Sequence, residues 1–229
     1  MQLSAKPFKT LSDAERTNLA VGLFEEKDTH AAVLKAHPAL RRLLETGDFK
    51  GKANDCVVLY PESGTTRLMA VGLGKRAAFG ARQSMEASAT AVRRAGKLGV
   101  ERLAFALPAE AGASAAVVEG AAEGARLGAY TFDRFQSKKE GEGSKTVAAC
   151  TVAVSASARA EILDKACRTG AVIGEAQAFV RDLASLPSNF KTPTQLGKEA
   201  RKMARKAGLA CTLIDRAAAE KLKMGSFLG

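Results

Sequence analysis

The sequence has 229 residues, of which 46% are hydrophobic and 26% charged, a composition typical of a folded globular protein and not of a disordered one. A chain of this length suits one or two domains and buries roughly 70% of its surface on folding. The net charge of +11 favours an anionic partner such as nucleic acid, or acidic residues downstream that balance it.

Predicted strands and helices alternate from residue 19 onward. Strands are expected at 19–24, 56–60, 67–73, 102–107 and 146–154, and helices at about 81–98 and 114–128. The region 29–45 is expected to be helical, interrupted at Pro38 and ending at Gly47, and residues 141–145 are expected to form a polar turn. This alternation predicts an α/β layered domain with a largely parallel or mixed sheet.

A long helix is predicted from about residue 158 to 186, and it ends in a rigid joint. Its apolar face is expected to carry residues at three-, four- and seven-residue spacing: Ile162, Leu163, Ala166, Ile173, Val180 and Leu183. Pro187 disfavours helix at Leu186, and Thr192 followed by Pro193 is a typical helix start. The segment between them is therefore expected to join two structural units.

The joint leads into an amphipathic helix predicted over residues 193–207, with Gly208 as its C-cap. The apolar side is expected to carry Leu196, Ala200, Met203, Ala204 and Ala207, and the opposite side Lys198, Arg201, Lys202, Arg205 and Lys206. A strand at 209–214 and a helix at 216–223, capped by Asp215, are expected to follow.

The positive charge is concentrated in this last stretch. Residues 198–229 hold eight Lys and Arg and three Asp and Glu, giving +5, whereas residues 1–197 hold 27 and 21, giving +6. Such a basic helix face is usually solvated, and duplex DNA is the alternative partner. Aromatic residues make up only 5% of the chain and Trp is absent, so few side chains are available on which the bases of single-stranded nucleic acid could stack.

The joint, residues 180–193, resembles the hinge of the cytosol (leucyl) aminopeptidase family, which consists of metal-dependent exopeptidases. The matching positions are Arg181, Asp182, Leu183, Pro187, Asn189, Thr192 and Pro193, while Ser185 stands where the family usually has Asn. Three earlier stretches resemble the family's N-terminal domain: residues 47–51, 71–75, and 124–135 followed by Lys138 and Lys139. Residues 224–229 resemble the lead-in to the first strand of its catalytic sheet.

The resemblance implies a macro-domain-like α/β N-terminal domain with a mixed sheet over residues 1–157, an interdomain helix and hinge over 158–191, and the truncated start of a second α/β domain, the catalytic one, over 192–229. The parent protein would remove N-terminal residues, preferably Leu, from peptides with two zinc or manganese ions, and would assemble as a hexamer. This part would support assembly and control access to the active site.

The family's metal-binding motifs, Gly-x-Thr-Phe-Asp-Ser-Gly-Gly and Asn-Thr-Asp-Ala-Glu-Gly-Arg, do not occur in this sequence. We therefore expect no catalytic, cofactor-binding or metal-binding residue here, and no activity from this chain alone. Glu199, Asp215 and Glu220 are scattered over three predicted elements, and Asp182 is expected to play a structural role beside Arg181.

Other motifs give only partial matches. Gly72 and Gly74 follow a strand as in a GxGxxG nucleotide site, but the third glycine is replaced by Ala77, so a tight strand-to-helix turn is favoured. Residues 188–191 fit the SxxK pattern of a serine nucleophile, but its companion motifs, SDN and KTG, are absent. We therefore expect these residues to serve in a turn and in helix capping. His30 and His37 are the only histidines, with no further metal-ligand pattern.

The four cysteines are far apart, at positions 56, 150, 167 and 211, and form no CxxC pair. Buried thiols in a reducing compartment are expected. Residues 1–13 lack the apolar core and cleavage pattern of a signal peptide, and no run of about 18 apolar residues predicts a membrane span. These features predict a cytoplasmic protein. Two hypotheses remain: the N-terminal portion of a leucyl aminopeptidase, or a basic DNA-binding module.

Overall fold

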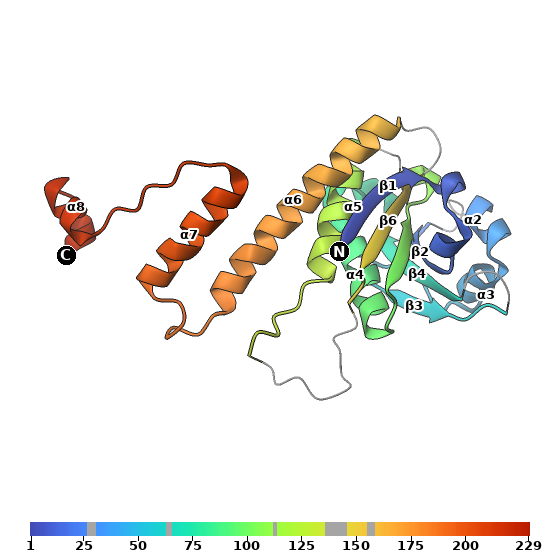
Figure 1. Cartoon of the computed structure of the whole chain (residues 1–229). Coiled ribbons are helices and arrows are strands. Elements are labelled where there is room, and N and C mark those ends of the chain that lie inside the picture. Colours follow the sequence, from blue (N-terminus) through green and yellow to red (C-terminus); the bar gives the residue numbers. More distant parts are fainter. Residues whose placement is uncertain (27–30, 63–65, 112–113, 136–145, 155–158) are drawn as a thin grey trace. The chain divides into compact units, whose positions relative to one another are not determined.

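The computed structural model describes residues 1–26, 31–62, 66–111, 114–135, 146–154 and 159–229. Six strands form one mixed sheet in the order β1-β6-β5-β2-β4-β3 (Figure 1). The strands are β1 (Gln2–Pro7), β2 (Asn18–Phe24), β3 (Cys56–Leu59), β4 (Arg67–Gly74), β5 (Arg102–Ala106) and β6 (Ala149–Val154). Neighbouring strands are parallel except for β3, which runs antiparallel to β4. The predicted α/β layered fold with a mixed sheet is confirmed.

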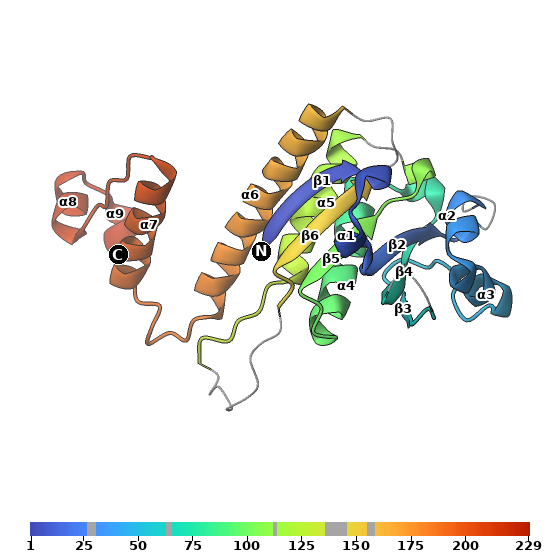
Figure 2. The same cartoon turned by 45° about the vertical axis from the view of Figure 1, so that its right-hand side comes forward.

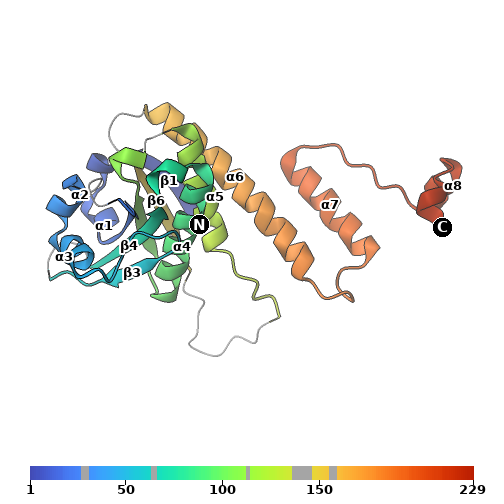
Figure 3. The same cartoon turned by 180° about the vertical axis from the view of Figure 1, so that it is seen from behind.

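Helices cover both faces of this sheet (Figures 1, 2 and 3). The larger core lies under α4 (Ala81–Lys97), α5 (Ala115–Gly128) and the first turns of α6 (Ala160–Ser185). The smaller core lies under α3 (Pro38–Thr46), near α1 (Asp13–Arg16) and α2 (Ala31–Ala36). Residues of β2 and β4 alternate between the two cores, as expected of strands buried on both faces: Phe24 and Met69 face the larger core, and Leu23 and Leu68 face the smaller one.

Glycine lets α4, α5 and α6 pack at unusually short range. A Cβ atom at Gly124 of α5 would lie 2.0 Å from the carbonyl oxygen of Met85 in α4, and one at Gly170 of α6 would lie 2.1 Å from that of Glu119 in α5. Polar pairs add to the second contact, since Gln177 donates a hydrogen bond to Glu123 and Arg126 forms an ion pair of 3.4 Å with Glu175. The middle of α6, from Gly170 to Gln177, is thereby fixed to α5.

The joint has the predicted caps. Helix α6 ends at Ser185, ahead of Pro187, and α7 (Pro193–Ala207) begins after Thr192, whose hydroxyl accepts a hydrogen bond of 3.3 Å from the Gln195 amide. Gly208 ends α7 in the left-handed region with φ 68°. Asp215 caps α8 (Arg216–Lys221) through a 2.8 Å hydrogen bond from the Ala218 amide.

The chain divides into two compact units, residues 1–179 and 180–229. The second unit, which the structure describes completely, consists of the end of α6 together with α7, α8 and α9 (Gly225–Leu228). Only three of its apolar side chains are buried: Leu186, Ala204 and Ala219. No described helix combines the length and apolarity needed to cross a membrane.

Two expectations about local structure were wrong, and one strand was missed. Residues 209–214 are not a strand but an exposed, irregular segment, which is followed by α8 and by the short helix at residues 225–228. Strand β1 was not predicted, because its residues alternate between exposed and half-buried positions at the edge of the sheet. On α6, Ile162 and Val180 are exposed at 46% and 60%, and the buried face is made largely of smaller residues. The polar turn expected at 141–145 lies outside the described residues.

Candidate functional site

The glycines at the end of β4 serve backbone packing. The amides of Gly72 and Gly74 each donate a 2.9 Å hydrogen bond to a backbone carbonyl, those of Asp55 and Gly51. A Cβ atom at Gly72 would lie 1.7 Å from the carbonyl oxygen of Lys52. Because both amides are already used, this turn does not present the free N–H groups that a phosphate-binding loop needs. Close approach of the segment 51–55 accounts for these glycines.

Residues 187–191 form a turn. The amides of Phe190 and Lys191 both donate to the carbonyl of Pro187, at 2.9 and 3.0 Å. The Lys191 ammonium donates to the carbonyl of Ala184 near the end of α6, at 3.5 Å, and Ser188 is exposed. The lysine thus satisfies a helix end, and nothing places it as a base for the serine.

The two histidines do not form a described site. His37 precedes α3 half-buried, and burial, with a smaller effect of the Arg16 charge, lowers the pKa of its imidazole. His30 lies outside the described residues. Among the residues that the structure describes, no three His, Cys, Asp or Glu side chains gather closely enough to hold a metal ion.

The cysteines differ sharply in exposure. Cys150 on β6 and Cys167 on α6 are buried in the larger core, Cys56 is half-buried, and Cys211 is exposed. Burial raises the pKa of the Cys150 thiol to about 12 and that of Cys167 to about 11. A thiol that stays protonated is a poor nucleophile and metal ligand, so these two cysteines act as small core residues.

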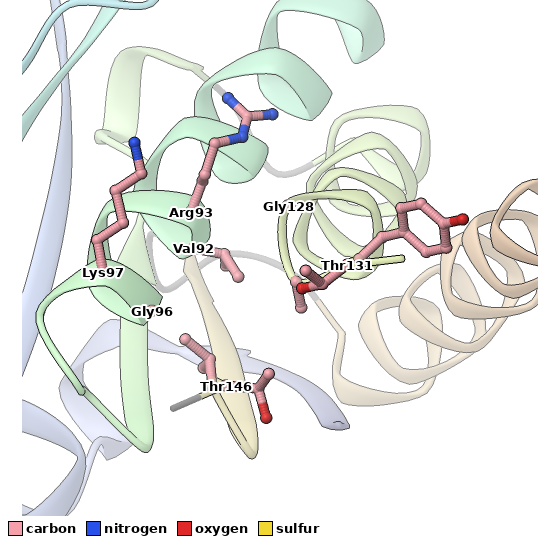
Figure 4. A pocket seen from close by; sticks show the side chains of 10 residues that line it. Val92, Arg93, Gly96, Lys97, Gly128, Thr131 and Thr146 are labelled. Carbon is pink, nitrogen blue, oxygen red and sulfur yellow. The ribbon is translucent and has the colours of Figure 1, made fainter. Parts of the chain in front are cut away.

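A cavity of about 370 Å³ opens where the ends of α4 and α5 meet the start of β6 (Figure 4). Its apolar surface includes the buried residues Val92 and Val147. Its complete lining is Val92, Arg93, Gly96, Lys97, Gly128, Ala129, Tyr130, Thr131, Thr146 and Val147. Sequence reasoning did not find this site, because its lining comes from three separate segments and matches no motif.

The charge around this cavity is positive. Arg93 and Lys97 are exposed on α4, and neither forms an ion pair with any acidic residue in the described ranges. Figure 4 shows Lys97 and Thr131 on opposite sides of the hollow. The carboxyl ends of α4 and α5 together contribute roughly one negative charge, which offsets only about half of the two cations.

The basic face of α7 is exposed as expected, from Lys198 to Lys206. Leu196 and Met203, on the other side of this helix, are exposed at 47% and 42%. A solvated charged face accounts for the lysines and arginines. The DNA-binding alternative therefore rests on charge alone.

Comparison with known proteins gives the family. The N-terminal domain of the cytosol aminopeptidase family matches residues 20–139, which is more than half of the chain. The probable cytosol aminopeptidase of Solibacter usitatus is 34% identical over 223 residues, covering 96% of this chain and 44% of that protein. That of Acidobacterium capsulatum is 32% identical over 202 residues, covering 87% and 39%. The chain belongs to the cytosol aminopeptidase family.

Solved structures agree with this assignment. A mutant of tomato leucine aminopeptidase superposes with a TM-score of 0.79 at 23% identity, covering 97% of this chain and 46% of that one, and so shares the fold. The bottromycin maturation enzyme BotP in complex with Mn has a TM-score of 0.66 at 26% identity, covering 90% and 40%. The chain thus spans less than half the length of these relatives.

Proposed function

We propose that this chain forms the amino-terminal portion of a leucyl aminopeptidase, a two-metal exopeptidase that releases N-terminal residues from peptides in the cytoplasm. The observation that carries the proposal is the family match over residues 20–139, supported by relatives that align with up to 97% of this chain but only 36–45% of their own length. Residues 1–157 would be the N-terminal domain, 158–191 the interdomain helix and hinge, and 192–229 the start of the catalytic domain.

The residues present do not fit a pair of zinc or manganese ions. Two dications about 3.5–4 Å apart need several converging carboxylates. After the joint, the acidic residues are Glu199, Asp215 and Glu220, on α7, ahead of α8 and on α8. Neither metal-binding motif of the family occurs in the sequence. We place the metal-binding residues in the part of the relatives' length that this chain does not span, and derive no catalytic step from this chain.

The proposed role of this chain is to support assembly and to restrict access to the catalytic part. The family match over residues 20–139 supports this role, because it assigns most of the first unit to the family's N-terminal domain. The parent protein would assemble as a homohexamer, and its substrates would be peptides.

Hydrolysis of leucine p-nitroanilide tests the placement of the active site. We expect no turnover by this chain with or without Mn²⁺ or Zn²⁺, while the full-length Solibacter usitatus relative, assayed in parallel, should be active and inhibited by EDTA. Turnover by this chain that EDTA abolishes would show that the active site is here.

A chimera tests the family role separately. A chimera in which this chain replaces the aligned 44% of the Solibacter usitatus protein should retain that protein's metal-dependent activity, because the two share 34% identity over that region. Size-exclusion chromatography serves as the folding control. A chimera that folds and assembles like the relative yet stays inactive would count against the proposal.

A further inference from the structure

We propose that the cavity between the carboxyl ends of α4 and α5 binds a small organic anion that has a compact apolar body, such as a branched-chain carboxylate. This inference goes beyond the proposed peptidase function and does not depend on it. It rests on the volume of the cavity, on its lining, and on the positive charge of Arg93 and Lys97, which no acidic residue in the described ranges pairs.

The size of the cavity suits a small ligand. Its volume of about 370 Å³ lies at the lower end of the range of roughly 300–1,000 Å³ that is typical of small-molecule sites. Glycines at positions 96 and 128 keep the walls low, and the clash of any Cβ at Gly128 with the Ala89 carbonyl, at 2.5 Å, shows how closely the helix ends approach there.

The lining separates into an apolar part and a polar part. Val92 and Val147 are 1% and 2% exposed, so they belong to the core and offer a fixed hydrophobic surface. The hydroxyls of Thr131 and Thr146 form no hydrogen bond with any described residue and are available to a ligand. A site of this kind, apolar with a few polar groups, is the usual form of a small-molecule site.

The charge of the residues that line the cavity determines whether an anion or a cation is favoured as its ligand. Arg93 and Lys97 are four residues apart, so both lie on the same side of α4. Figure 4 shows both side chains extending from that helix in the same direction, with their charged ends directed away from Thr146. With no acidic residue paired to them among the described residues, and with the two helix ends offsetting about one charge, the rim is left positive. Their long side chains are flexible enough to fold over a bound carboxylate. No carboxylate is among the described residues that line the cavity, so an α-ammonium group would find no partner among them, which favours a simple anion over a free amino acid.

Calorimetric titration of the 229-residue chain with 4-methylpentanoate tests the proposal. We expect saturable binding that weakens with added salt, and at least tenfold weaker binding for uncharged 4-methylpentanamide. The double variant Arg93→Gln, Lys97→Gln should bind 4-methylpentanoate about tenfold more weakly, as expected for the loss of two partly exposed ion pairs. Arg94→Gln is the matched control and should bind like the native chain. Arg94 is on the same helix, but its charge interacts with the Cys56 thiol and its side chain does not line the cavity.

Inorganic phosphate distinguishes a general anion site from the proposed one and should bind at least tenfold more weakly than 4-methylpentanoate. Thr131→Phe, which fills the hollow from an exposed position, should abolish binding while circular dichroism stays native. The proposal is overturned if 4-methylpentanoate does not bind, if its amide binds equally well, or if the double variant and Arg94→Gln lose the same affinity.

Discussion

At the scale of single residues, burial separates side chains of the same type into reactive and inert groups. Cys150 and Cys167 lie in the larger core with pKa values of about 12 and 11, whereas Cys211 is exposed in the second unit. At pH 8 a thiol with such a raised pKa is almost entirely protonated, and only the thiolate attacks a disulfide reagent. Position in the fold thus decides which cysteines react.

We expect one fast thiol reaction when the native chain is treated with DTNB at pH 8, at Cys211. Cys56, which is half-buried with a raised pKa, should react more slowly, and Cys150 and Cys167 should react only after unfolding in guanidinium chloride. Raising the pH toward 10 should speed the reaction of Cys56, because its thiolate fraction grows. The fast phase should disappear in Cys211→Ser; a fast phase that persists in this variant would contradict the assignment.

At the scale of elements, the helical layer depends on glycine as much as on large apolar residues. Gly120, Gly124 and Gly128 of α5 all face backbone atoms of α4, and Gly170 of α6 faces the backbone of α5. Backbone cannot move aside as a flexible side chain can. A methyl group added at these positions must therefore push two helices apart.

We expect Gly124→Ala to lower the free energy of unfolding by about 3 kcal/mol, because its Cβ would lie 2.0 Å from the Met85 carbonyl oxygen and the clash outweighs the better helix propensity of alanine. Urea denaturation followed by circular dichroism measures the change.

The control is Gly197→Ala on α7, whose Cβ would meet only the end of the Leu213 side chain, at 3.0 Å. That side chain can shift, so we expect a change within about 1 kcal/mol, of either sign. Equal losses for the two variants would contradict the backbone-clash explanation.

Elements with a strong local pattern could be predicted from sequence, and those defined by distant partners could not. The apolar run of β2 and the caps Thr192, Gly208 and Asp215 appear in the structure as predicted. Strand β1 depends on pairing with β6, and its own residues show little apolar pattern. The segment 209–214 has a strand-like sequence but no strand beside it among the described residues, and its apolar side chains Leu209 and Ile214 are exposed at 61% and 51%.

The candidate cavity was beyond sequence reasoning for a similar reason. Arg93 and Lys97 look like ordinary surface residues of a helix until the end of α5 and the start of β6 are placed beside them. By contrast, the family assignment could be predicted, because the hinge and the N-terminal stretches carry recognisable strings of residues.

At the scale of the whole molecule, the two units differ in how much apolar surface they bury. Residues 1–179 contain both hydrophobic cores, while residues 180–229 bury only Leu186, Ala204 and Ala219. Large exposed apolar residues such as Leu222 and Phe227, at 61% and 82%, remain on the second unit. Since burial supplies most of the stability of a fold, the first unit should be far more stable than the second.

We expect hydrogen–deuterium exchange, followed by mass spectrometry, to show this difference. Amides of β5 and β2, at the centre of the sheet, should exchange only through global unfolding, whereas those of α7 and α8 should exchange at least tenfold faster. Amides of α4 provide an internal control, because they belong to a helix that packs on the sheet. Equal protection of α7 and α4 would show that the second unit is stabilised by something other than its own buried side chains.

The pairing of β1 with β6 has a consequence for folding during synthesis. Gln2 lies opposite Ala149, and the Ser4 and Thr151 hydroxyls are 3.2 Å apart, so among the described strands the earliest in the sequence, β1, pairs with the latest, β6. At about 5–20 residues per second, a ribosome needs roughly 7–30 s to make the chain between them. Strand β1 must therefore stay unpaired while β2, β4 and β5 assemble. It joins this edge of the sheet as a late step of folding, once β6 has been made.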